Sequence, residues 1–102
     1  MFRLTTYHGA NALVIKVEGE FRGEYAENTR TLVAGGKAGM QLVVDLTDVT
    51  FVDSVGEEVL SFLGRLGAEF VADTAYLRDL CERLKLPFQR TAKAASSDIK
   101  YK

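Results

Sequence analysis

The chain has few residues that could support redox or metal chemistry. Its 102 residues include one cysteine, Cys81, and one histidine, His8. A single cysteine cannot form a disulfide within the chain, and a single histidine cannot build a metal site without carboxylates from elsewhere. The sequence therefore predicts a protein with no metal centre and no bound cofactor.

Long apolar runs and an excess of positive charge are also missing. No run approaches the roughly 20 apolar residues that a membrane-spanning helix needs, and the first residues lack the hydrophobic stretch of a secretory signal. The formal net charge is −1, and four of the thirteen basic residues lie in the last thirteen positions, so the preceding part is acidic. Nucleic-acid phosphates require a basic surface. We therefore predict a cytoplasmic protein that neither inserts into a membrane nor binds nucleic acid.

The length and composition are those of one globular domain. The chain is 47% hydrophobic and 26% charged, which suffices for one core. We assign residues 1–88 to this domain. Residues 89–102 are polar, small and basic, and we expect them to form a flexible tail or a docking extension.

The first half of the chain predicts two strands and a helix. Residues 2–6 and 13–18 show the period-two pattern of strands, with apolar residues at every second position, and the glycine-containing turn between them predicts a hairpin. Gly19 and Gly23 are expected to bracket a loop. The next apolar positions have helical spacing, and the glycines at 35, 36 and 39 end that helix. These positions are Tyr25, Thr29, Leu32 and Val33.

The second half predicts a buried strand and the clearest helix. Residues 42–46 form an almost continuous apolar run, typical of a strand covered on both faces in a mainly parallel sheet. Residues 47–50 are expected to turn the chain, and residues 51–52 to extend it. The helix that follows is stopped by Gly67. Its apolar positions are Val55, Val59, Phe62, Leu63 and Leu66.

A short strand and a third helix complete the pattern. Residues 69–72 predict the strand, Asp73 or Thr74 can cap the helix, and Pro87 prevents its continuation. The order is β-β-α-β-α-β-α, which requires crossover helices. We therefore predict an α/β fold with a mixed, mainly parallel sheet of about four strands and three or so helices. The apolar positions of the last helix are Leu77, Leu80, Cys81 and Leu84.

The candidates for catalysis are weak. Ser54 has no plausible histidine base, since His8 lies near an amino-terminal turn. Residues 35–39 are rich in glycine but follow a helix, unlike the phosphate loops that follow a strand. Glu57 and Glu58 are adjacent on a helix, so their side chains point roughly 100° apart. The sequence therefore predicts that the protein is not an enzyme.

Residues 54–57 match the capping box S-x-x-E. In this motif the serine oxygen accepts a hydrogen bond from the N–H of Glu57, and the glutamate accepts one from the N–H of Ser54. The motif predicts that Ser54 is the N-cap of its helix. A structural role alone accounts for the motif, because serine is among the commonest caps.

A longer segment around this motif resembles the signature of the STAS family. Residues 42–56 read LVVDLTDVTFVDSVG, similar to the family's strand, short turn and Asp-Ser-Ser/Thr-Gly-Leu. Residues 17–21 also resemble the Gly-Glu-Leu stretch after the family's second strand, and the order of elements agrees from Phe2 to about Phe88. The resemblance implies a STAS-like fold.

The resemblance also implies a function. In the bacterial anti-sigma factor antagonists of this family, a partner that is both anti-sigma factor and serine kinase phosphorylates the corresponding serine, here Ser54. The unphosphorylated antagonist binds the kinase, which then releases the sigma factor, whereas the phosphorylated antagonist dissociates from the kinase. This partner switch regulates transcription. The residues implied at the partner surface are Phe21, Arg22, Asp53, Ser54, Val55, Gly56, Glu57 and Glu58.

The sequence is also compatible with other functions. Three residues differ from the family pattern, namely Arg22, Val55 and Glu57. Val55 and Glu57 favour a different role, that of a non-phosphorylated accessory subunit in a larger assembly. STAS domains serve this role in lipid-transport ATPases and anion transporters. A phosphotransfer receiver is disfavoured because it needs an acidic pair after its first strand. The sequence leaves open whether two copies form a homodimer.

Overall fold

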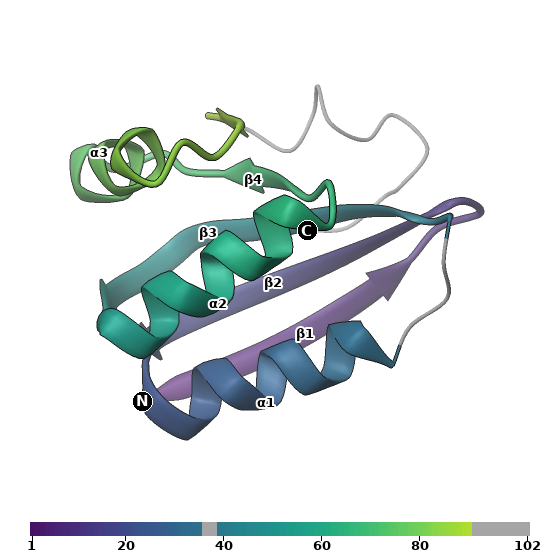
Figure 1. The fold of residues 1–102 in the computed structure, drawn as a ribbon, viewed down its shortest axis with the longest axis horizontal. Helices are drawn as coiled ribbons and strands as arrows, with labels where there is room; N and C mark the ends of the chain where they lie inside the picture. The colour runs from purple at the N-terminus through teal and green to yellow at the C-terminus, as the bar shows by residue number, and fades with distance from the viewer. Residues whose placement is uncertain (36–38, 91–102) are drawn as a thin grey trace.

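A computed structural model describes residues 1–35 and 39–90 (Figure 1). The strands in this part are β1 (Phe2–His8), β2 (Ala12–Phe21), β3 (Gln41–Val52), β4 (Glu69–Val71) and β5 (Phe88–Gln89). The helices are α1 (Gly23–Ala34), α2 (Ser54–Arg65) and α3 (Ala75–Arg83).

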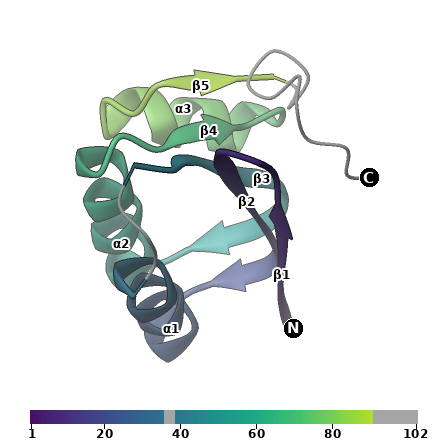
Figure 2. The same cartoon turned by 90° about the vertical axis from the view of Figure 1, so that its right-hand side faces the viewer.

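The strands form one five-stranded sheet in the order β1-β2-β3-β4-β5. β1 is antiparallel to β2, and every other neighbouring pair is parallel. The predicted α/β class and mainly parallel mixed sheet are confirmed, and β5 is added to the strands expected from the sequence. Because the chain crosses the sheet in one direction, right-handed connections place α1, α2 and α3 on the same face. Figure 2 shows α1 and α2 along one side of the sheet.

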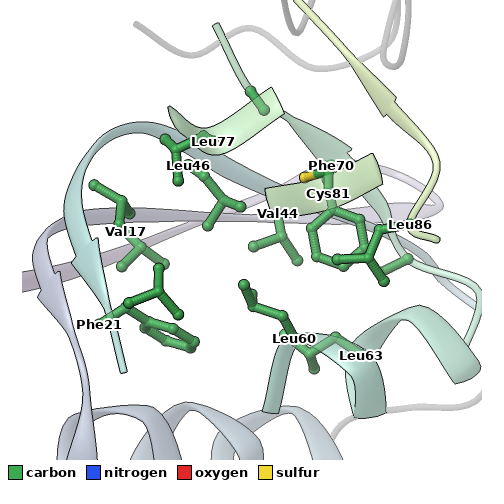
Figure 3. Packing of buried hydrophobic residues seen from close by; sticks show 14 of the residues in the cluster. Val17, Phe21, Val44, Leu46, Leu60, Leu63, Phe70, Leu77, Cys81 and Leu86 are labelled. Carbon is green, nitrogen blue, oxygen red and sulfur yellow. The ribbon is translucent and has the colours of Figure 1, made fainter. Parts of the chain in front are cut away.

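The main core lies between this face and the helices (Figure 3). Side chains from all three helices and from β2, β3 and β4 belong to one buried cluster. Phe21 and Phe70 are its largest fully buried side chains. The cluster also includes Val17, Val44, Leu46, Leu60, Leu63, Leu77, Cys81 and Leu86.

β2 continues through the position where a loop was predicted, so that prediction is wrong. Gly19 lies inside the strand with a φ of 91°, and Gly23 is the first residue of α1. A Cβ on Gly19 would collide with the carbonyl oxygen of Met1, and the next amide, on Glu20, donates a hydrogen bond to that oxygen at 2.9 Å. The glycine therefore allows the start of the chain to approach β2 closely.

The turn predicted at residues 47–50 is also wrong, because β3 remains extended to Val52. Three of these four residues are β-branched, and such side chains favour the extended conformation. The pairing of β3 with β2 shifts register twice, between Lys16 and Glu18 and between Gly19 and Glu20. These irregularities interrupt the regular alternation that would otherwise mark a long strand in the sequence.

The last strand lies at the boundary of the predicted tail. Phe88 pairs with Phe70, and Gln89 pairs with Val71. β5 thus includes Gln89, a residue that was predicted to belong to the tail, and Pro87 precedes the strand after α3 has ended. The rest of the predicted tail, residues 91–102, lies outside the described residues.

Cys81 is fully buried on α3, as its place in the apolar pattern predicted. Burial raises the pKa of its thiol to about 11. In the unfolded chain the thiol pKa is lower, near 8.5. The folded state therefore favours the neutral thiol, and this preference stabilises the fold at low pH relative to high pH. This contribution is complete below about pH 8 and is lost as the pH rises through the folded pKa.

We therefore expect the stability difference between the wild type and Cys81→Ala to depend on pH. The variant has no thiol to titrate, so the stability of the wild type relative to the variant should fall by roughly 3 kcal/mol between about pH 8 and pH 11. Urea unfolding followed by circular dichroism measures both proteins at each pH. A constant difference would contradict the expectation.

Candidate functional site

Two helices begin beside each other at the carboxyl ends of β2 and β3. Phe21 ends β2 and is paired with Val52, which ends β3. α1 begins two residues after Phe21, and α2 begins two residues after Val52. Sites in open α/β sheets commonly form at the carboxyl ends of the strands.

Asp53 connects the two helix starts. Its Oδ1 accepts a hydrogen bond from the Gly56 N–H at 2.8 Å, and its Oδ2 accepts one from the Gly23 N–H at 3.2 Å. Arg22, the N-cap residue of α1, makes no side-chain cap bond of its own. One carboxylate therefore satisfies backbone donors at the start of both helices.

The prediction that Ser54 caps α2 is wrong. Asp53 is the N-cap, and Ser54 is the first residue of the helix. Aspartate caps a helix as well as serine does, and the aspartate here also reaches α1. Glu57 does not complete a capping box either. Its carboxylate binds the guanidinium of Arg83 through two contacts of 3.3 Å.

The pair between Glu57 and Arg83 joins α2 to the end of α3. The hydrogen bond and the charge of Glu57 raise the pKa of the Arg83 guanidinium above its usual value. Both side chains keep access to solvent, so the pair positions charge at the surface and adds little to stability.

Gly56 allows α2 to begin close to the ends of the strands. A Cβ at this position would collide with the carbonyl oxygen of Phe21 and would lie 2.8 Å from Cγ1 of Val52. The glycine thus sets the distance between the first turn of α2 and the strands. This is the physical reason for a glycine in the D-S-V-G segment.

Ser54 is exposed and borders an open groove of about 480 Å³. Within the described part of the chain, its hydroxyl makes no side-chain hydrogen bond. The groove follows the outer face of α2, with acidic residues near Ser54 and a basic residue, Arg65, at the other end. It is lined by Arg30, Ser54, Glu57, Glu58, Ser61, Phe62, Arg65 and Leu84.

Arg30 of α1 and Phe62 of α2 line the groove and make a cation–π contact with each other. The guanidinium of Arg30 lies 5.6 Å from the ring centre of Phe62 and also binds Glu27 at 2.9 Å. This contact links α1 to α2 at the groove.

The predicted partner residues differ in accessibility. The exposed ones are Arg22, Ser54 and Glu58, the half-buried ones are Asp53, Val55 and Glu57, and the buried ones are Phe21 and Gly56. Arg22 is paired with Glu20 at 2.8 Å. Phe21 and Gly56 therefore have a structural role, and the other six predicted residues form the surface that a partner could reach.

Residues from α3 complete the site and were missed in the sequence. The hydroxyl of Tyr76 accepts a hydrogen bond from the Val52 N–H at 3.0 Å. Tyr76 and Phe51 remain about half exposed beside the turn at Asp53. Tyr76 is 24 positions from Val52, and Arg83 is 26 positions from Glu57. No local periodicity reveals contacts over such separations.

The described residues offer neither a metal site nor a membrane-spanning helix. Residues 1–35 and 39–90 contain no group of three or more His, Cys, Asp or Glu that could hold a metal ion. In the same residues, every helix is too short or too polar to cross a bilayer.

The arrangement is that of a STAS-like α/β domain with an exposed serine at a shared helix start. No protein-family model and no curated protein matches the sequence. An anti-sigma factor antagonist from Mycobacterium paratuberculosis has a similar structure, with a TM-score of 0.76 and 21% identity. That match covers 95% of this chain and 92% of the other.

Two further solved structures share the fold. The anti-sigma factor antagonist SpoIIAA in its unphosphorylated form matches with a TM-score of 0.66 and 17% identity, over 96% of each chain. An uncharacterized protein with a SpoIIAA-like fold from Shewanella loihica has a TM-score of 0.63 and 14% identity. It covers 94% of this chain and 91% of its own. The chain therefore has a SpoIIAA-like fold, and the STAS-like fold predicted from the sequence is confirmed.

Proposed function

We propose that this chain is a regulatory protein-binding module that acts as an anti-sigma factor antagonist in the cytoplasm. It binds an anti-sigma factor that is also a serine kinase, and phosphorylation of Ser54 ends the binding. It has no catalytic activity of its own. The observation that carries the proposal is the position of Ser54, exposed at the first residue of α2 and beside the groove.

The site can accept a phosphate without unfolding. Ser54 belongs to the first turn of α2, where backbone N–H groups and the positive end of the helix dipole favour negative charge. Because the cap is Asp53, modification of Ser54 leaves the capping hydrogen bonds in place. The modified domain therefore keeps its fold, and the change is limited to its surface.

The same surface offers contacts to a protein and a means to break them. Phe51 and Tyr76 are exposed aromatic side chains near the turn, the type of residue that often anchors an interface. Phosphorylation adds roughly 1.5 to 2 negative charges beside Asp53 and Glu58. A partner that docks over Ser54 is then repelled by charge and by bulk.

Phosphorylation in solution tests the proposal. We expect one phosphate after incubation with ATP and the anti-sigma factor serine kinase proposed as the partner, measured by intact mass and mapped to Ser54. Ser54→Ala should abolish it. Ser61→Ala is the matched control, because Ser61 lies in the same groove, and it should leave the phosphate in place.

Binding measurements complete this test. Ser54→Asp should weaken binding to the kinase at least about tenfold, equivalent to about 1.4 kcal/mol, by isothermal titration calorimetry. Its unfolding free energy should remain within about 0.5 kcal/mol of the wild type. A wild-type protein that takes up no phosphate, or a Ser54→Asp variant that binds as tightly as the wild type, would contradict the switch.

The charge around Ser54 favours a second candidate. Glu57 and Glu58 line the same groove, so negative charge is near the hydroxyl before any modification. A non-phosphorylated accessory subunit of a lipid-transport ATPase or an anion transporter would not need a good kinase substrate. Absence of phosphate together with a stable complex with a transporter subunit would favour this role.

A further inference from the structure

The sheet has a second face, opposite the three helices, that carries a buried apolar strip. Val14 on β2, Val43 on β3 and Val71 on β4 form a cluster of their own and are at most 2% exposed. Of the partly buried apolar side chains in the described residues, Tyr7 of β1 is the one packed against it. One side chain at the β1 end does not account for the burial of three valines on three strands.

The strip extends to the last strand. The register pairs Val14 with Val43 and pairs Val71 with Gln89, so the Gln89 side chain lies on the same face as Val71. The Gln89 Oε1 atom is buried, and no donor in the described part of the chain bonds to it. A buried carbonyl oxygen without a donor is costly, so a donor from outside residues 1–35 and 39–90 is expected here.

Acidic side chains surround the strip. Asp45 is 5% exposed, and Glu18 and Glu69 are half-buried on the same face. The Nζ atom of Lys16 lies 3.9 Å from Oδ2 of Asp45 and 2.9 Å from Oδ2 of Asp48, so this lysine offsets part of the negative charge. A segment that covers this face would therefore bind more favourably if it carried positive charge.

We propose that the carboxyl-terminal segment, residues 91–102, covers this face of the sheet. The segment follows Gln89 after a single residue, so it starts at the β5 end of the strip. Twelve residues can extend over about 40 Å, whereas the distance from β5 to β2 is about 15 Å. The segment is therefore long enough to reach Val14.

The composition of the segment matches the face. Ile99 and Tyr101 are its large apolar residues, and they can pack on the valines. Lys93, Lys100 and Lys102 complement the acidic side chains, and Asp98 is the one acidic residue of the segment. Its first backbone N–H groups can supply the donor for Gln89. The segment would then belong to the folded domain, and its displacement would expose an apolar surface on the side away from Ser54's groove.

Nuclear magnetic resonance on the full-length chain tests this proposal. With labelled valine and isoleucine methyl groups, we expect nuclear Overhauser effects between Ile99 or Tyr101 and the methyl groups of Val14, Val43 or Val71. Their absence would overturn the proposal. Effects that arise only between isotopically mixed copies would show that a second copy covers the face, and this outcome would overturn it too.

Dye binding gives an independent readout. The double variant Ile99→Ser/Tyr101→Ser should increase the fluorescence of the hydrophobic dye ANS severalfold, because the valines become accessible. Ser96→Ala/Ser97→Ala is the matched control and should leave the signal unchanged. Equal fluorescence in all three proteins would contradict the proposal, and the resonance experiment on the wild type decides the matter if the double variant does not fold.

Discussion

Gly56→Ala is expected to lower the free energy of unfolding by about 3 kcal/mol. The added methyl group would collide with the carbonyl oxygen of Phe21 and lie 2.8 Å from Cγ1 of Val52. The Phe21 carbonyl is backbone and Val52 is 5% exposed, so neither can move aside without disturbing the ends of β2 and β3. The first turn of α2 must shift instead.

Gly64→Ala provides the matched control, because it makes the same substitution in the same helix. Its Cβ would lie 2.7 Å from Cδ2 of Leu86, the far end of a side chain that can change rotamer. A gain in helix propensity of about 1 kcal/mol offsets this contact, so we expect little net change. Urea unfolding measures both variants. Equal stability losses would show that the clash at Gly56 is not the cause.

Asp53→Ala is expected to cost about 2–3 kcal/mol of unfolding free energy. The substitution removes the acceptor for Gly23 N–H and for Gly56 N–H, and both hydrogen bonds are partly buried. Loss of a helix cap costs about 1 kcal/mol, and a partly buried donor left without an acceptor adds a similar amount.

Two substitutions make this prediction specific. Asp53→Asn keeps one carbonyl oxygen as an acceptor and should cost less than Asp53→Ala. Asp73→Ala also removes an aspartate close to a helix start, but α3 is capped by Thr74 and Asp73 is exposed. We expect its effect to remain within about 0.5 kcal/mol in thermal and urea unfolding. A loss at Asp73 as large as that at Asp53 would contradict the assigned role.

Much of the fold could be predicted because its signals are local. The continuous apolar run at residues 42–46 indicated the buried centre of β3, and helical spacing located α2, with Val59 and Leu63 buried as expected. Thr74 was one of two candidate caps for α3, and its hydroxyl accepts the Leu77 N–H at 3.2 Å. Hydrophobic periodicity and capping chemistry act within a few residues, so a single sequence reveals them.

The errors at the site have a common physical cause. Both Asp53 and Ser54 can cap a helix, and the choice depends on Gly23, which is 30 positions from Asp53 in the sequence. Glu57 could have completed a capping box, but Arg83 on α3 binds it instead. In each case a residue distant in sequence decides between two local structures that are similar in energy. The resemblance to the STAS signature located the turn, but it did not reveal these partners.

The carboxylate shared by α1 and α2 affects how the domain can open. The Gly23 and Gly56 amides donate to the same side chain, that of Asp53. When the start of one helix frays, Asp53 loses one of these two hydrogen bonds and holds the start of the other helix less firmly. The two turns therefore form one cooperative unit of local unfolding. A protein that binds over the first turn of α2 would steady the start of α1 as well, so the effect of binding would extend to residues that it does not touch.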